Sequence, residues 1–350
     1  MWRYADRDRN VNEIARELGV VYLLDGSVRR HGDHLRITAE LVQVAQSRTI
    51  WAEHFDGSQS DIFDFQDRIV SRLVGALEPR VRAAETERVR NRPTSSLDAY
   101  DCVLKAASQL FQFTDESFRL SGEALDRAIQ LDPSYAQAYA YSAWRLNFLI
   151  GEERSADPEG DKARASSMAQ RAMTLDQEDA FSLAIAGHLL GFAERRPQDA
   201  LAIFDNALAL DENSALAWAL SGLALSYCGR PDEAMERYQN AFKLSPFDQL
   251  NFSWWGAAGI AQLVAGRYSE AAAWLRRSRL ANPRFAATLR MLAAALALQG
   301  NEAEARAVAA DLLKIAPKFR VQRFIEWYPL QRRDDLVRLE RGLLLAGLPP

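Results

Sequence analysis

The stretch that decides the fold runs from Trp218 to Pro246 and reads WALSGLALSYCGRPDEAMERYQNAFKLSP. It predicts two amphipathic helices that pack on each other. Small residues such as Gly222 and Ala234 let the two helices approach closely, and larger ones such as Tyr238 fill the space against the next unit. Pro246 cannot continue a helix and starts the next unit.

The same pattern recurs along the chain. Downstream copies occupy residues 255–283 and 289–317, and an upstream copy at 183–212 has one extra residue in its turn. The copies loosen farther upstream, at 139–177 and 128–133. Their internal spacing resembles that of a tetratricopeptide repeat, whose period is about 34 residues. No single repeat can bury its apolar face alone, so stacking of repeats is expected to supply the core.

The first part of the chain follows a different pattern. Segments that alternate apolar and polar residues predict an antiparallel meander with one wet face. Helices are expected before it at residues 11–18 and after it at about 61–92, and a linker is expected at 92–96. The predicted strand segments are Val20–Leu24 continuing through Ser27–Arg30, then Leu35–Val42, and then Thr49–Phe55.

The expected fold class is therefore α+β, predominantly α. Residues 1–92 are expected to form a small antiparallel α/β domain with a trailing helix. Residues 97–318 are expected to form an α-solenoid of about six tetratricopeptide helix pairs, and residues 319–350 to form C-terminal capping helices.

Four segments of the first domain resemble one particular bacterial module, the FlgO-like or TolB-N-like α/β domain. They are residues 18–29, 35–41, 50–56 and 61–67, and the closing residues 343–349 are similar to the tail of its cyclase-linked relatives. In that family the module joins an upstream class III adenylate cyclase domain, or a winged-helix DNA-binding domain, to a downstream tetratricopeptide array.

The chain differs from this family at its start, where Met1-Trp2-Arg3-Tyr4 enters the module after its first strand and helix. Either the start is truncated, or the missing strand is dispensable or supplied elsewhere. An exposed sheet edge there would be open to a partner strand, and a homodimer stays an alternative.

Composition narrows the function. The net charge of −4 gives no electrostatic support for binding nucleic acid. Two cysteines exclude a disulfide framework and fit a reducing compartment. No apolar run reaches the roughly 18 to 20 residues of a membrane span, and the first residues lack the apolar core of a signal peptide. We expect a cytoplasmic protein without a membrane span.

No catalytic constellation is recognisable in the sequence. Phosphate-binding loops, nucleophile elbows and the paired metal-binding aspartates of class III cyclases are absent. Asp61, Asp64 and Asp67 are expected to be solvated acids at a helix start. The four histidines fit no structural zinc pattern, and the two cysteines are expected to be small buried apolar groups. We expect no enzyme activity, no metal and no cofactor.

The resemblance to tetratricopeptide proteins implies a concave groove lined by the first helices of the repeats. A fixed offset then places the exposed positions, which are mostly apolar and lack a lysine–asparagine clamp for a terminal carboxylate. A peptide or helix with an apolar face is the expected protein partner. The alternative for each residue is packing between repeats or under the C-terminal helix. The residues expected to bind the partner are Trp144, Asn147, Phe148, His188, Phe192, Leu223, Tyr227, Ile260 and Arg290, and the wider lining adds Gln137, Phe181, Leu263 and Val264.

Two local expectations accompany this groove. Trp255 is expected to hold a packing position, so that only Trp254 is exposed. The segment 151–161 is longer than a usual repeat turn and is expected to be a solvated insertion, with a partner contact as the alternative.

Three functions compete at this point. The favoured one is a non-catalytic regulatory and protein–protein interaction module of a bacterial signalling protein. The second is part of an adenylate or guanylate cyclase family protein whose catalytic domain is missing from this chain. The third is part of a winged-helix transcription regulator without its DNA-binding domain.

Overall fold

The computed structural model describes residues 20, 22–32, 34–44, 48–58 and 99–350. The chain divides into two compact units, Met1–Asn91 and Arg92–Pro350. The helices predicted at 11–18 and 61–92, the linker at 92–96 and the acids Asp61, Asp64 and Asp67 lie outside the described residues.

The described part of the first unit is an antiparallel meander of three strands in the order β1-β2-β3. The strands are β1 (Tyr22–His31), β2 (His34–Gln43) and β3 (Arg48–Ser58). Leu41 lies opposite Trp51 on the buried face, and the ion pair between Arg36 and Asp56 (2.6 Å) is exposed. The alternation in the sequence therefore predicted both the pairing and the wet face correctly.

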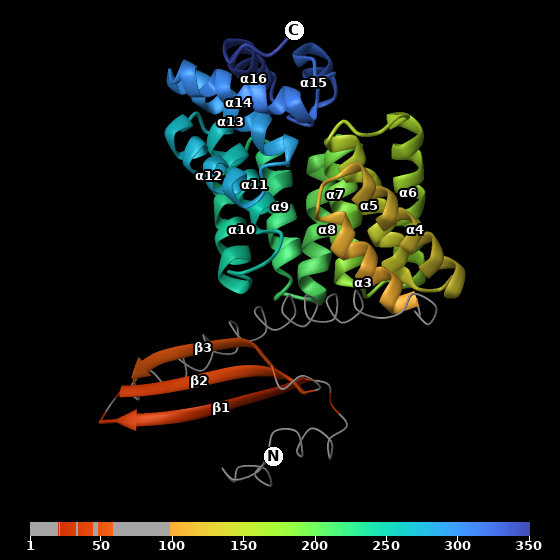
Figure 1. Ribbon diagram of the computed structural model, residues 1–350, viewed down its shortest axis with the longest axis vertical. Coiled ribbons are helices and arrows are strands. Elements are labelled where there is room, and N and C mark those ends of the chain that lie inside the picture. Colours follow the sequence, from red (N-terminus) through yellow and green to blue (C-terminus); the bar gives the residue numbers. More distant parts are fainter. Residues whose placement is uncertain (1–19, 21, 33, 45–47, 59–98) are drawn as a thin grey trace. The chain divides into compact units, whose positions relative to one another are not determined.

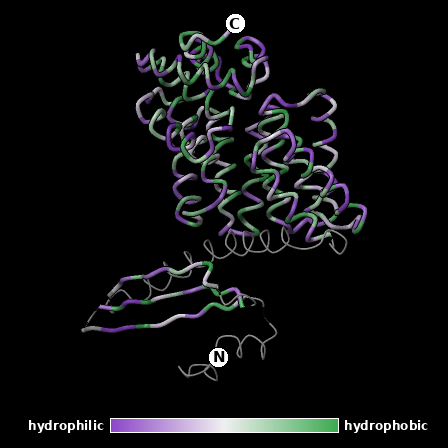
Figure 2. Tube along the Cα trace, in the orientation of Figure 1, coloured by the Kyte–Doolittle hydropathy of each residue, from purple (hydrophilic) through white to green (hydrophobic). Residues whose placement is uncertain are grey.

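The second unit is an array of helix pairs followed by a short capping segment (Figure 1). Each pair consists of a first and a second helix that pack side by side, and Figure 2 shows hydrophobic residues recurring along these helices between hydrophilic ones. The pairs are α3 (Ala99–Leu110) with α4 (Asp115–Leu131), α5 (Ala136–Gly151) with α6 (Pro158–Leu175), α7 (Ala180–Phe192) with α8 (Pro197–Leu210), α9 (Ala215–Tyr227) with α10 (Pro231–Leu244), α11 (Asn251–Val264) with α12 (Tyr268–Ala281), and α13 (Ala286–Gln299) with α14 (Glu302–Ile315).

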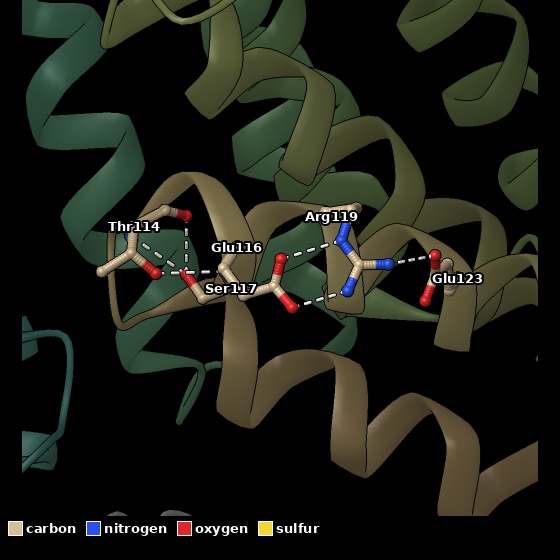
Figure 3. Close-up of polar contacts among 5 residues, drawn as sticks. All are labelled: Thr114, Glu116, Ser117, Arg119 and Glu123. Atoms are coloured by element: carbon tan, nitrogen blue, oxygen red, sulfur yellow. Dashed lines mark hydrogen bonds and ion pairs between the residues drawn. The ribbon is translucent and has the colours of Figure 1, made fainter.

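Helix starts are fixed by local sequence. Thr114 caps α4, because its side chain accepts a hydrogen bond from the Ser117 backbone N–H while the Ser117 hydroxyl accepts from the Thr114 N–H (Figure 3). This reciprocal arrangement satisfies two amides that the helix leaves unpaired. One turn farther on, Arg119 pairs with Glu116 and Glu123 on the exposed face. Proline at the first turn begins α6, α8 and α10.

Close approach within a pair depends on glycine in the first helix. A Cβ added at Gly222 would lie 2.9 Å from the Tyr238 ring and 3.1 Å from the Ala234 carbonyl oxygen, so no side chain fits there. Tyr238 and Ala234 are completely buried. The packing roles predicted for the small residues are therefore correct.

The capping segment, residues 319–350, contains α15 (Val321–Trp327) and α16 (Arg333–Leu345). Phe319, Phe324 and Leu343 are fully buried in the same core cluster as α13. The segment is also tied to the ends of first helices, because the Gln331 N–H donates to the Tyr227 carbonyl at 3.0 Å. It thus seals the apolar face of the last pair, as terminal units of solenoids must.

Candidate functional site

The first helices of five successive pairs surround one partly open cavity, which we call the central cavity. Its volume is about 80 Å³, and its walls come from α5, α7, α9, α11 and α13 together with the capping segment. The lining is mainly aromatic and aliphatic. The lining residues are Trp144, Asn147, Phe148, Gly151, Glu152, His188, Phe192, Leu220, Leu223, Tyr227, Leu250, Ser253, Trp254, Gly256, Ala257, Ile260, Phe285, Ala287, Thr288, Arg290, Met291 and Tyr328.

All nine residues predicted to bind a partner line this cavity, so the repeat offset placed them on one surface. Their exposure differs from the expectation. His188, Phe192 and Leu223 are partly exposed, whereas the other six are buried. Of the wider set, Leu263 and Val264 are buried in the core, and neither they nor Gln137 and Phe181 are among the lining residues.

The expectation of an open groove is wrong for the buried members of this set. Trp144 is only 2% exposed because it stacks on Phe148 (ring centroids 5.5 Å apart) and meets the edge of Phe111 at 5.4 Å. Tyr227 is 3% exposed because Tyr328 of the capping segment packs edge-on against it at 5.8 Å. The capping segment therefore covers part of the surface that the sequence predicted to be open.

Arg290 is the clearest correction, since it is a structural tie rather than an exposed binding residue. Its Nη2 donates to the Gly151 carbonyl at 2.5 Å, and its Nη1 pairs with Glu153 at 3.3 Å. The guanidinium also lies 4.8 Å from the centre of the Phe324 ring. Arg290 thus joins the end of α5 to α13 and to the capping segment.

The loop after α5 is not simply a solvated insertion. Glu152 is 3% exposed, and its carboxylate accepts hydrogen bonds from the Ala286 and Ala287 backbone N–H groups at 2.7 and 3.2 Å. These amides begin α13, where a carboxylate is favoured by the helix dipole. Burial raises the pKa of Glu152, although Arg290 and the two amides oppose that shift. Only the later part of the loop, such as Asp157, is exposed as predicted.

The two adjacent tryptophans have the reverse of their predicted roles. Trp254 is 2% exposed and lines the central cavity, whereas Trp255 is partly exposed and its ring lies 3.9 Å from the Arg277 guanidinium carbon. The repeat alignment placed Trp255 at the large packing position. The structure shows instead that the face of α11 toward the cavity carries Trp254.

Titratable groups in the lining are shifted toward their neutral forms by burial. His188 stacks on Phe192 with ring centroids 5.8 Å apart, and burial lowers its pKa to about 4. Burial likewise raises the pKa of Tyr227 well above its ordinary value. At neutral pH both side chains are uncharged, so the apolar character of the lining extends to them.

Sequence reasoning missed several lining residues, above all Glu152, Phe285 and Tyr328. Glu152 belongs to the loop that breaks the repeat pattern, and Tyr328 belongs to the capping segment, which has no repeat to align. Phe285 carried a weak signal, because it follows Pro283 at the start of a repeat.

The described ranges contain neither a cluster of metal-ligating side chains nor a helix that could span a membrane. No group of three or more His, Cys, Asp or Glu side chains is arranged there to hold a metal ion. Likewise, none of the described helices combines the length and the apolar character needed to cross a bilayer. Cys102 is buried, as expected, and Cys228 is partly buried, which raises the pKa of its thiol.

Comparison with known sequences finds one partial relative and no matching family model. No family model matches this chain. A protein of Rhizobium meliloti (strain 1021) named "Putative adenylate cyclase 3" is 32% identical over 187 residues, which are 52% of this chain and 32% of that protein. This chain therefore matches only about a third of the curated relative's length.

One solved structure is similar in fold, and a second has a lower score. The crystal structure of the APC/C hetero-tetramer Cut9-Hcn1 is 17% identical with a TM-score of 0.53, over 83% of this chain and 54% of that chain. The structure of TTC0263, a thermophilic TPR protein in Thermus thermophilus, is 16% identical with a TM-score of 0.44, over 57% of this chain and 98% of that chain. The predicted fold class, a small antiparallel sheet followed by a tetratricopeptide-type solenoid, is confirmed.

Proposed function

We propose that this chain is a non-catalytic regulatory and protein–protein interaction module of a bacterial signalling protein. In this proposal an apolar or amphipathic segment of a partner docks beside the first helices and inserts one side chain into the central cavity. The observation that carries the proposal is that all nine residues selected by the repeat offset line that single cavity.

The size of the cavity limits how much of a partner can enter it. Its volume of about 80 Å³ is roughly half that of an engineered cavity of about 150 Å³ that binds benzene. A whole helix does not fit such a space, but one compact side chain does. The partly exposed His188, Phe192 and Leu223 would then contact the rest of the segment. An anchor in a desolvated pocket with weaker contacts around it is how interfaces concentrate their energy.

The signalling role rests on two independent indications. One is the partial similarity to the protein named as an adenylate cyclase. The other is the resemblance of residues 18–67 to the FlgO-like or TolB-N-like domain. We propose domain limits of 1–92 for that domain, 97–318 for the repeat array and 319–350 for the capping segment. We propose that the module regulates an effector of that kind in the cytoplasm. A winged-helix regulator is the second candidate, on the same resemblance.

The binding proposal is tested by changing the partly exposed lining. Phe192→Ala combined with Leu223→Ala should weaken capture of a partner by at least about ten-fold, because both variants remove apolar contacts around the anchor and each buried CH₂ group is worth about 0.8 kcal/mol. Capture is measured with the full chain as bait against a lysate of a related bacterium, and the affinity is then measured with the purified partner. Circular dichroism checks that the fold is retained.

The matched control is Phe242→Ala, which removes a partly buried aromatic ring of α10 that stacks on Trp274 and does not line the cavity. It should leave capture unchanged. Equal loss in the control, or full retention in the double variant, would show that partners bind elsewhere on the chain.

A further inference from the structure

The central cavity contains polar atoms that have no partner. Trp144 Nε1, Asn147 Oδ1, Arg290 Nε and Tyr328 Oη are buried without a hydrogen bond that meets the usual geometry, and all four residues line the cavity. The Tyr328 hydroxyl interacts with the Tyr227 side chain, which leaves Trp144 Nε1, Asn147 Oδ1 and Arg290 Nε. Their side chains belong to residues that are only 2%, 3% and 2% exposed. Buried polar atoms in proteins nearly always have a partner, so these three point to an occupant of the cavity.

Two of the three atoms belong to the wall formed by α5, and Arg290 of α13 is tied to the end of that wall. Trp144, Asn147 and Gly151 follow each other at the spacing of one helical face along α5. Arg290 donates to the Gly151 carbonyl at 2.5 Å, which holds its guanidinium at the end of the same face. The wall therefore offers two N–H donors and an amide, while aromatic and aliphatic residues form the other walls.

The charges around this wall favour an uncharged occupant. The positive charge of Arg290 is already opposed by Glu153 at 3.3 Å and by Glu152 at 4.0 Å. An anionic guest would face those two carboxylates, and a cationic guest would face the guanidinium. A neutral group avoids both penalties, since a charge without a dedicated partner is costly to bury.

We infer that the group entering the central cavity is compact and uncharged, with an aliphatic body and a head that both accepts and donates hydrogen bonds. The head accepts from the Trp144 indole and the Arg290 Nε–H, and it donates to the Asn147 amide oxygen. On a partner segment, threonine, asparagine and glutamine have this chemistry, whereas leucine does not. The inference rests on the proposed function, because it specifies the anchor of that same site.

The test compares small probes on the full chain. Isobutyramide has the required head, and 3-methylbutan-2-one has the same shape but no N–H donor. Isobutyrate has the same body with a negative charge. Binding is followed by NMR through the indole N–H signal of Trp144, assigned with Trp144→Phe. We expect isobutyramide to bind at least about five-fold more tightly than either other probe, which is the worth of one neutral hydrogen bond.

Asn147→Leu should remove the preference for isobutyramide over the ketone. Gln262→Leu is the control, because Gln262 is a buried amide of α11 that does not line the cavity, and it should keep the preference. If Asn147→Leu fails to fold, Trp144→Phe serves as the second variant, and binding to it is followed through the broadening of the probe's own methyl signals, because the indole signal is gone. It should weaken isobutyramide and the ketone equally, since both use the indole donor.

The outcomes separate the inference from the proposed function. Equal binding of amide and ketone, or a cavity that holds water and no probe, overturns the inference even where partner capture still depends on Phe192 and Leu223. Conversely, a clear amide preference in a chain whose partner capture ignores those residues supports the cavity chemistry and overturns the docking proposal.

Discussion

Single residues in the lining make the stability of the array depend on pH. Burial lowers the pKa of His188 to about 4, against about 6.5 in an unfolded chain. As the pH falls through this window, the unfolded state binds a proton that the folded state refuses. The stability contributed by neutral His188 is therefore complete above about pH 6.5 and is lost as the pH falls toward 4.

We accordingly expect His188 to account for about 2 kcal/mol of the fall in unfolding free energy between pH 7 and pH 5. In His188→Phe the new ring still packs against Phe192 but cannot bind a proton. The unfolding free energy of this variant should therefore fall by about 2 kcal/mol less between pH 7 and pH 5. Urea unfolding of both proteins at the two pH values measures the difference, and other titrating groups cancel in the comparison. An identical fall in both would mean that His188 is accessible to protons in the folded state.

It was easier to predict from the sequence which residues share one surface than to predict how exposed each of them is. The repeat offset selected Trp144, Tyr227 and Arg290 correctly as members of one surface, because that surface follows from helical geometry. The burial of Tyr227 and Arg290 depends on contacts that no repeat encodes, the loop after α5 and the capping segment, whereas Trp144 is covered by Phe148 and Phe111. The repeat register holds at Trp255, because Gly259 packs on Leu275 as Gly222 packs on Tyr238. Its neighbour Trp254, about 100° away around the helix, carries the ring that lines the cavity.

Helix packing within pairs depends on a few glycines, and the contact partner decides the cost of replacing them. At Gly222 a new methyl group meets the backbone oxygen of Ala234 and the fully buried Tyr238 ring. At Gly122 of α4 it meets the guanidinium of Arg145, a side chain that can shift more easily than backbone but whose Nε donates to the Phe118 carbonyl at 2.6 Å. The two sites therefore separate intrinsic helix propensity from packing.

Gly222→Ala should lower the free energy of unfolding by about 1–3 kcal/mol, since overpacking outweighs the gain of roughly 1 kcal/mol that alanine brings to a helix interior. Gly122→Ala should cost less than Gly222→Ala, at most about 1–2 kcal/mol, because the same gain partly offsets the displacement of Arg145 and the weakening of its hydrogen bond to Phe118. Thermal and chemical denaturation of both variants give the comparison. A stable Gly222→Ala would contradict the close helix contact.

The turn between the two helices of a pair explains why the early repeats were hard to recognise. In the last three pairs the turn residue has a positive φ and is glycine, at Gly229, Gly266 and Gly300. In the first three pairs the turn residue also has a positive φ, but it is Phe113, Glu153 or Arg195. Residues other than glycine rarely adopt this backbone conformation. The glycine signal is therefore missing from the half of the array where the sequence copies loosen. The structure reveals what these side chains contribute.

Each of these three side chains reaches a distant part of the array. The Phe113 ring meets Phe285 at 5.1 Å, Glu153 pairs with Arg290, and Arg195 donates to the Glu326 carbonyl at 2.9 Å. In an ordinary solenoid each repeat contacts only its neighbours, and stability is a sum of local terms. In this array the early pairs are tied to the last pair and to the capping segment, so all the pairs are expected to unfold in one step.

Glu152 is the best place to test this cooperativity. Glu152→Ala leaves the first amides of α13 without a partner and removes one of the two carboxylates beside Arg290. Arg290 keeps Glu153 at 3.3 Å, so the main cost is that of the unpaired buried amides, typically about 1–3 kcal/mol. Because Glu152 joins the end of α5 to α13, we expect the variant to lose cooperative unfolding as well as to have a lower unfolding midpoint. Hydrogen exchange should show residues 286–350 opening before residues 99–175, whereas the parent protects both regions equally.

The matched control is Glu152→Gln, which should lose less stability than Glu152→Ala. Its amide oxygen still accepts one N–H, and the neutral group avoids the burial that raises the pKa of the carboxyl. If both variants open every helix together at a reduced midpoint, the Glu152 tie is not what makes the pairs unfold in one step. That tie would then contribute stability without cooperativity.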